Sequence, residues 1–161
     1  MLRRAALAAA LLLGSACSPG DEADHTGGPA AGRDGLGARE RALLAELGAG
    51  LLDADLENGR RLYRRCSACH TLGESEAHLV GPNLHGLFGR TAGAQEGFGY
   101  SAALGDAEFV WTPERLDEWL ASPRTFLPGN RMSFAGLRHA DDRRDVIAYI
   151  AVETSPVSEA D

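Results

Sequence analysis

The chain has 161 residues and a formal net charge of -7, and all 16 of its basic residues are arginine. A negative net charge disfavours nucleic acid as a partner. The length favours one folded domain with an additional segment. Hydrophobic residues make up 44% of the chain but aromatic residues only 6%, so the core is thin unless a buried apolar cofactor completes it.

Residues 1–16 have the composition of an export signal. Arg3 and Arg4 precede an apolar run over residues 5–13, and small residues follow at 14–16. This is the order of a signal peptide and its cleavage site. The apolar run is far shorter than the roughly 20 residues of a membrane-spanning helix.

Cys17 directly follows these small residues, at the position of the lipidated cysteine in bacterial lipoproteins. The segment resembles a lipobox, and cleavage after Ala16 without lipidation is the alternative. An odd cysteine in an exported protein needs such an explanation. We therefore expect the protein on the periplasmic side of the bacterial envelope, attached to membrane lipid through Cys17.

Residues 17–52 are expected to form a linker ahead of the folded domain. Residues 18–37 are rich in glycine, proline, alanine and acidic residues, a composition that favours a disordered tether. From residue 38 to 57 the leucines recur three or four positions apart, which predicts an amphipathic helix interrupted by glycines. A short helix against the domain is favoured over a helix that binds a partner. The leucines and glycines are Leu43, Leu44, Leu47, Leu51, Leu52, Gly48 and Gly50.

The folded domain is expected over residues 53–157, followed by a tail at 158–161. Residues 57–65 are predicted to form a first helix. A threonine cap followed by proline opens a second helix over residues 112–120, and residues 141–152 form a third with an apolar face. Loops rich in glycine and proline join these helices, and no alternating strand pattern is present. The expected fold class is all-α, with short helices wrapped around a cofactor.

The segment 66–70 reads Cys-Ser-Ala-Cys-His, which is the pattern of a c-type haem attachment site. Thiols three positions apart on a helical turn, here Cys66 and Cys69, reach the two vinyl groups on one side of a porphyrin and form thioethers with them. The adjacent histidine then lies below the iron as an axial ligand. The sequence predicts one covalently attached haem c whose iron is bound by His70.

A redox-active cysteine pair and a zinc site are the alternatives for these cysteines. A redox pair is expected in a thioredoxin-like βαβ context, which this sequence lacks. A structural zinc site needs four ligands, and the other histidines stand at no recognisable metal spacing. Haem is favoured over both alternatives. The other histidines are His25, His78, His85 and His139.

The sixth iron ligand decides between an electron carrier and a catalyst. A His/Met pair suits electron transfer, whereas an open position suits ligand binding or peroxide chemistry. Met1 is lost with the signal peptide, so Met132 is the methionine candidate. It lies in a turn-forming stretch at 128–132 that can present its thioether to the iron. A lone methionine is otherwise more often core filling.

From residue 59 to residue 149 the sequence resembles class I cytochrome c, in its mitochondrial-like bacterial branch. The matching stretches follow that family's order and nearly its spacing. The resemblance implies a class I cytochrome c fold and does not extend to residues 1–52. The matching stretches are 66–70, 81–90, 97–101, Trp111, 128–134 and 145–149.

The resemblance also implies roles for single residues. Pro82 matches the residue whose carbonyl accepts the proton on the far nitrogen of the ligand histidine. Arg90, Tyr100 and Trp111 match groups that stabilise a buried haem propionate. Phe134 matches the aromatic side chain beside the exposed haem edge.

Two positions depart from the family pattern. Trp119 stands where a tyrosine usually donates a hydrogen bond to the methionine sulfur, so the strength of the iron–methionine bond is left open. Asn130 replaces a threonine near the propionate, and an amide can also donate there. We expect a positive reduction potential that differs from the mitochondrial value.

The resulting hypothesis is a monomeric electron carrier rather than an enzyme. It moves one electron from a quinol-oxidising respiratory complex to a terminal oxidase or similar acceptor in the membrane. Arginines around the haem edge are the candidates for docking, since the family's usual lysines are absent. A haem enzyme or ligand sensor with a labile Met132 is the alternative, and a subunit held in a larger complex by residues 43–52 is another. The arginines are Arg60, Arg61, Arg64, Arg65, Arg131 and Arg138.

Overall fold

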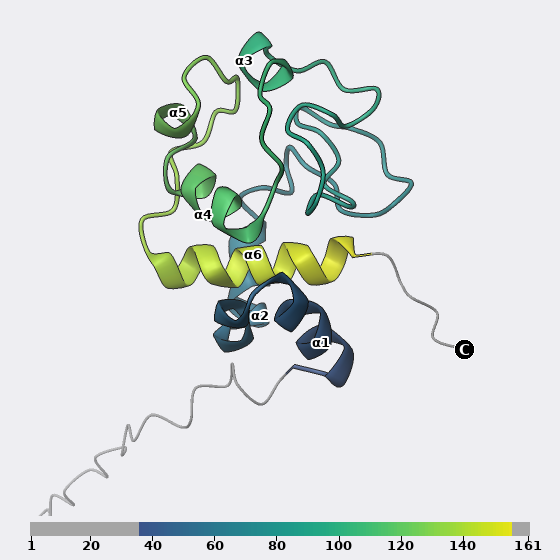
Figure 1. Cartoon of the computed structure of the whole chain (residues 1–161), viewed down its shortest axis with the longest axis vertical. Helices are drawn as coiled ribbons and strands as arrows, with labels where there is room; N and C mark the ends of the chain where they lie inside the picture. Colours follow the sequence, from purple (N-terminus) through teal and green to yellow (C-terminus); the bar gives the residue numbers. More distant parts are fainter. Residues whose placement is uncertain (1–35, 156–161) are drawn as a thin grey trace, which may run out of the picture.

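The computed structural model describes residues 36–155, and this part of the chain is built from helices and loops (Figure 1). An isolated bridge pairs Thr91 with Val110, and no longer strand forms among the described residues. The expected all-α fold class is confirmed. The elements are α1 (Ala38–Leu47), the 3-10 helix η1 (Ala49–Asp53), α2 (Leu56–Tyr63), α3 (Ala102–Gly105), α4 (Pro113–Ala121), α5 (Pro123–Phe126) and α6 (Ala140–Thr154).

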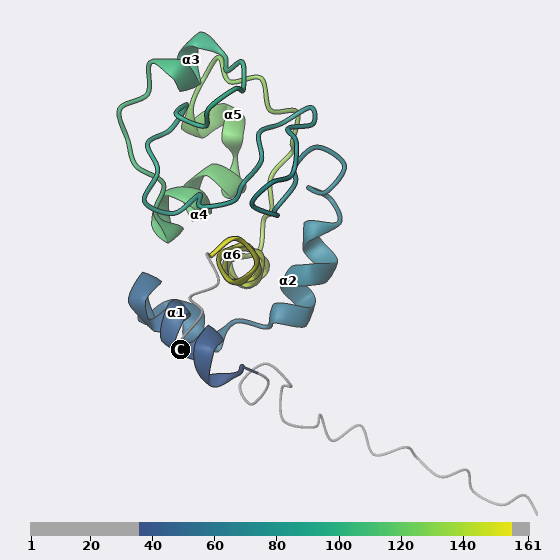
Figure 2. The same cartoon turned by 90° about the vertical axis from the view of Figure 1, so that its right-hand side faces the viewer.

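Helix α6 lies at the centre of the molecule. Figure 2 looks along it and shows α1 and α2 on one side, with the loops and α3, α4 and α5 on the other. The faces of α6 are therefore covered in nearly every direction. In the middle of this helix, Val146, Ile147 and Ala148 are at most 2% exposed and belong to the core.

The crossing of α2 and α6 depends on Gly59. A Cβ at this position would overlap the backbone carbonyl of Asp145, so only glycine allows the two helices to approach this closely. The Asp145 carboxylate, 3% exposed, accepts hydrogen bonds from the Asp55 amide at 3.0 Å and the Asn58 side chain at 2.8 Å. It also pairs with Arg144 at 3.3 Å. These partners satisfy a carboxylate that would otherwise be costly to bury.

The segment before the expected domain boundary at residue 53 packs against the domain. Helix α1 and η1 both contact α6. The side chain of Leu44 is fully buried, and Leu51 and Leu36 are 6% and 8% exposed. The packed unit therefore extends from Leu36, because these leucines remove apolar surface from water on the side of α6 that α2 leaves uncovered.

Helices α2 and α4 each begin with a side-chain cap. The Asp55 carboxylate accepts from the Asn58 amide at the start of α2, and the Thr112 hydroxyl accepts from the Arg115 amide at the start of α4, where Pro113 occupies the first turn. The short helices α3 and α5 have only four residues each. The sequence patterns did not predict them.

Side-chain hydrogen bonds hold the long loops that replace regular structure. Asn83, 2% exposed, donates to the hydroxyl of Thr71 and the carbonyl of Gly73. The His78 ring accepts from the Asn83 amide at 3.0 Å through Nδ1 and donates to the Glu96 carbonyl at 2.8 Å through Nε2. This neutral tautomer ties two loops together beside the cavity described below.

Several expectations lie outside the described residues. They are the signal peptide at 1–16, Cys17, the tether up to residue 35 and the tail at 158–161. Over residues 36–155, no helix combines the length and apolar character needed to cross a membrane.

Candidate functional site

A cavity of about 540 Å³ lies between the loops, α4 and α6. This volume is within the usual range for a small-molecule or cofactor site. Most of the wall is apolar. The apolar part of the lining includes Leu84, Leu87, Leu104, Leu116, Leu120 and Ile150.

The two cysteines and the histidine of the attachment motif line one wall of this cavity. They follow directly on α2 in a tight turn, where the Cys66 amide donates to the Tyr63 carbonyl at 2.7 Å and the His70 amide donates to the Cys66 carbonyl at 2.9 Å. The turn places Cys66, Cys69 and His70 together as the motif spacing predicts. Cys66 and Cys69 are not joined in a disulfide.

Burial raises the pKa of the Cys66 thiol to about 11. A redox-active cysteine needs the opposite shift, because the thiolate is the reactive form. In addition, no cluster of three histidine, cysteine or acidic side chains suited to a metal ion exists in the described part of the chain. The raised thiol pKa weighs against a redox-active pair, and the missing third ligand among the described residues weighs against a zinc site.

The ring of His70 is oriented by the chain that follows it. Its Nδ1–H donates to the Pro82 carbonyl at 2.7 Å, which leaves Nε2 as the nitrogen able to bind a metal. Burial lowers the pKa of His70, and the bond to Pro82 opposes this shift. A Cβ on Gly81 would overlap the imidazole, so glycine is required for the ring to lie against the backbone here.

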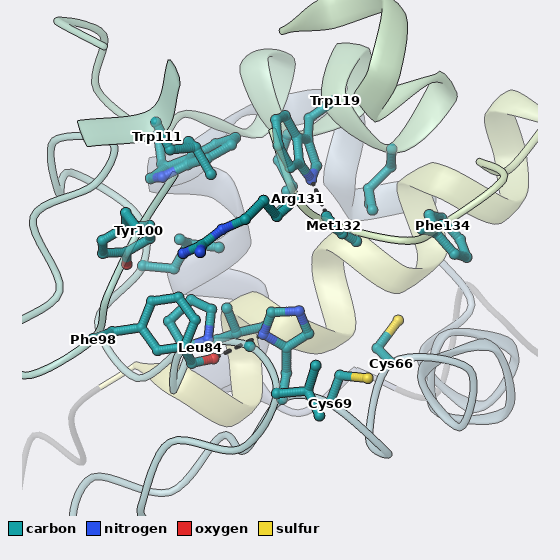
Figure 3. A pocket seen from close by; sticks show the side chains of 18 of the residues that line it. Cys66, Cys69, Leu84, Phe98, Tyr100, Trp111, Trp119, Arg131, Met132 and Phe134 are labelled. Atoms are coloured by element: carbon teal, nitrogen blue, oxygen red, sulfur yellow. Dashed lines mark hydrogen bonds between the residues drawn. The ribbon is translucent and has the colours of Figure 1, made fainter. Parts of the chain in front are cut away.

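Met132 lies across the cavity from Cys69, beside Trp119 of α4 (Figure 3). The indole N–H of Trp119 donates to the Met132 sulfur at 3.2 Å. The indole thus donates the hydrogen bond to sulfur that a tyrosine usually makes at this position, which the sequence could not decide. Trp119 is held in turn by edge-to-face contacts with Trp111 and Phe126, with ring centroids 5.5 and 5.9 Å apart.

Asn130 does not line the cavity, in contrast to the role expected for it. Its side-chain N–H groups donate to the carbonyls of Pro123 and Leu127 at 2.8 and 2.7 Å. Its oxygen accepts from the Met132 amide at 3.0 Å. Both N–H donors are used to shape the loop that presents Met132, and so no donor remains for a ligand in the cavity.

Arg90, Tyr100 and Trp111 line one end of the cavity together. Arg90 donates to the His85 carbonyl at 2.7 Å, and desolvation lowers the pKa of its guanidinium. Burial raises the pKa of Tyr100, against the effect of Arg90. These polar groups, half-buried at Arg90 and Tyr100 and gathered in an apolar wall, favour a carboxylate partner.

Phe134 lines the cavity near its other end. The Arg65 guanidinium lies 5.2 Å from the centroid of its ring, a cation–π distance. Arg65 and Arg131 both line the cavity, although the sequence suggested them only as docking residues. Their side chains could not be placed from the sequence, because no periodic pattern governs these loops.

The donors present fit a covalently bound haem c. Two thiols and an imidazole lie on one wall, a thioether lies across from them, and the space between is largely apolar. In cytochromes, an imidazole and a thioether as the two axial iron ligands raise the reduction potential of the haem.

Several known proteins are similar to this chain over most of the described residues. The family described as Cytochrome c matches residues 56–152. "Cytochrome c 2.1" of Caenorhabditis elegans is 48% identical over 102 residues, which are 63% of this chain and 91% of that protein. "Cytochrome c" of Stellaria longipes is 42% identical over 106 residues, 65% and 98% of the two chains. "Cytochrome c2" of Agrobacterium tumefaciens is 39% identical over 106 residues, 64% and 96% of the two chains.

The similar proteins contradict the periplasmic, lipid-anchored location that the N-terminal residues led us to expect. The similar proteins include cytochromes c of a nematode, plants, an alga and a fungus, rather than lipid-anchored bacterial proteins. The expectation of a periplasmic protein anchored through Cys17 depended on the first 17 residues alone, and the matched region begins far downstream at residue 56.

Proposed function

The chain belongs to the cytochrome c family, and from this premise we propose that it carries one electron at a time between a quinol-oxidising respiratory complex and a terminal oxidase or similar acceptor. Proteins of this family bind one covalent haem c, with the histidine and methionine ligation typical of class I, and serve in electron transfer. The bound haem supplies the reversible one-electron change at iron. The polypeptide holds the cofactor and sets its environment.

The assignment of residues to this cofactor is part of the proposal. Cys66 and Cys69 would hold the haem through thioethers, and His70 and Met132 would bind its iron. The hydrogen bond between His70 and the Pro82 carbonyl keeps the imidazole in the tautomer that binds iron through Nε2. Phe134 lines the cavity and would lie beside the haem edge where an electron leaves or enters.

The observation that carries the proposal of a carrier is the bond from Trp119 to the Met132 sulfur. A thioether held by a neighbour that is itself packed among aromatic rings stays in place. A held sixth ligand leaves no position for peroxide or a gas, so electron transfer is favoured over an enzyme or a ligand sensor.

The optical spectrum of the haem-loaded protein tests this proposal. We expect the weak far-red band of the oxidised protein that reports an iron–sulfur(Met) bond, and no carbon monoxide binding by the reduced protein. The variant Met132→Ala should lose the band and bind carbon monoxide. A wild-type protein that lacks the band and binds carbon monoxide readily would instead support the enzyme or sensor alternative.

The proposed redox partners call for a separate measurement. A purified quinol–cytochrome c oxidoreductase should reduce the protein, and a cytochrome c oxidase should oxidise it, each at a rate that rises with the concentration of this protein. Failure of both reactions, with a normal optical spectrum, would leave a carrier with other partners.

A further inference from the structure

The charged residues of the cavity wall are all of one sign. Its lining contains the three arginines Arg65, Arg90 and Arg131 and no aspartate or glutamate among the described residues. This is unexpected in a chain whose net charge is -7. Guanidinium groups gathered at an apolar cavity are stabilised by an anionic ligand. A haem has two carboxylate groups, its propionates, and the question is which arginines bind them.

Arg131 reaches into the cavity rather than away from it. Figure 3 shows its side chain extending from the loop of Met132 toward Tyr100. Its guanidinium donates to the Gly99 carbonyl, immediately before Tyr100 in the chain. Arg131 therefore spans from the Met132 loop to the end of the cavity where Tyr100, Trp111 and Arg90 lie.

The other candidate donors have contacts of their own, and Arg90, at the same end, keeps N–H groups for a carboxylate beside Arg131. Arg65 lies over the ring of Phe134. Arg90 uses one terminal nitrogen for the His85 carbonyl at 2.7 Å and brings the other within 3.5 Å of the Asn83 carbonyl. The amide of Asn130 is committed to the backbone of its own loop.

We propose that Arg131 is a carboxylate-binding residue of the site, whose guanidinium pairs with a haem propionate at the end formed by Tyr100 and Trp111. The proposal deepens the proposed function and rests on it, since it requires haem attached at Cys66 and Cys69. A guanidinium has five N–H donors. Arg131 can therefore keep its bond to Gly99 while a parallel pair of N–H groups binds the carboxylate.

This pairing has a consequence for the iron. A propionate whose charge is balanced by Arg131 stabilises the oxidised, more positive iron less than an unbalanced carboxylate does. Removal of the guanidinium is therefore expected to lower the midpoint potential. Lysine at this position keeps the charge but not the parallel pair of donors.

The test compares haem-loaded wild type with Arg131→Gln, Arg131→Lys and the control Arg138→Gln. Arg138 is exposed and does not line the cavity, so its substitution removes the same charge from the same loop without touching the site. The readouts are the midpoint potential and the redox-difference infrared spectrum, recorded with haem whose propionate carboxyls carry ¹³C so that their bands are separated from those of the protein.

We expect Arg131→Gln to lower the potential and shift the labelled carboxylate bands, Arg131→Lys to shift the bands with a smaller loss of potential, and Arg138→Gln to leave the bands in place. Unchanged bands in Arg131→Gln, with a change of potential no larger than that of Arg138→Gln, would overturn the proposal. If Arg131→Gln does not mature with haem, the bands of Arg131→Lys decide in the same way. A wild type without the iron–sulfur(Met) band is a different result, because it would contradict the proposed function instead.

Discussion

At the scale of single residues, the site depends on hydrogen bonds from neighbours that orient the proposed ligands. The Pro82 carbonyl orients His70, and the Trp119 indole orients Met132. An indole differs from a tyrosine hydroxyl because it only donates. The Trp119 N–H uses one lone pair of the Met132 sulfur, which has no hydrogen to donate, and leaves the other lone pair for the iron.

The variant Trp119→Phe tests this role, because it keeps an aromatic ring in the α4 position and removes the donor. Loss of a hydrogen bond worth about 0.5–1.5 kcal/mol makes the sulfur a better electron donor to iron, which lowers the midpoint potential by roughly 20–60 mV. A redox titration measures the shift. The control is Phe126→Leu, which disturbs the same aromatic cluster without removing a donor. An equal shift in both variants would assign the effect to packing.

Three wholly or partly buried tyrosines predict how the stability of the fold depends on alkaline pH. Burial raises the pKa values of Tyr63, Tyr100 and Tyr149 above their ordinary value. The unfolded chain therefore loses these protons first, and the free energy of unfolding falls as the pH rises above about 10.

Tyr63 allows one contribution to this pH dependence to be measured, since it is 7% exposed and its hydroxyl donates to the His70 carbonyl at 2.9 Å. We expect Tyr63→Phe to lose about 1 kcal/mol of stability at neutral pH. Above pH 10 its stability should fall less steeply than that of wild type, by up to about 1.4 kcal/mol per pH unit. Denaturant unfolding at several pH values measures both effects, and parallel curves for the two proteins would refute the assignment.

At the scale of elements, the crossing of α2 and α6 and the packing of α1 on α6 hold the frame on which the cavity is built. The attachment turn begins where α2 ends, and Ile150 of α6 lines the cavity. A displacement of either helix is therefore transmitted directly to the site. This frame depends on Gly59 at the crossing and on Leu44 on the buried face of α1.

Gly59→Ala should separate the two helices, because the added methyl group overlaps the Asp145 carbonyl and contacts the Tyr149 side chain. Overpacking of this kind costs about 1–3 kcal/mol, which a lower melting temperature would reveal. Gly50→Ala is the matched control, since no atom lies within 4 Å of a Cβ built there. Equal melting temperatures for the two variants would contradict this account of the crossing.

Leu44→Ala tests whether α1 contributes to the stability of the domain. Leu44 is fully buried, and truncation of such a leucine costs about 2–5 kcal/mol. Leu43→Ala, one position earlier on a half-buried side chain, should cost much less. Denaturant unfolding of the two variants makes the comparison. A stability unchanged by Leu44→Ala would show that α1 is only loosely attached.

At the scale of the whole molecule, a net charge of -7 coexists with a cavity whose charged lining, over the described residues, is arginine alone. Arg65 and Arg131 are exposed as well as lining the cavity. Arg65 lies over the ring of Phe134, so the surface next to Phe134 is locally basic in an acidic protein. Electrostatic attraction to an acidic partner would then act over a short range around the cavity rather than over the whole surface.

The salt dependence of turnover tests this local attraction. With a cytochrome c oxidase as acceptor, the rate should fall between about 10 mM and 200 mM salt, because the Debye length shrinks from roughly 30 Å to below 10 Å. Arg65→Gln should reduce the salt dependence, and Arg144→Gln, whose charge is engaged by Asp141 and Asp145, serves as the control. A rate independent of salt would mean that docking does not rely on these arginines.

The sequence by itself determined the features that depend on local spacing. Two cysteines three positions apart and the histidine that follows them predict haem attachment, and a cap such as Thr112 before Pro113 predicts a helix start. Both features depend only on residues that are close together in the chain. Only the tertiary structure decided which side chains meet from distant segments. It directed the Trp119 indole onto the Met132 sulfur, turned the Asn130 amide into its own loop, and brought Arg131 to Tyr100. It also packed α1 against α6. These outcomes depend on loop paths and helix crossings that no periodic pattern of residues encodes.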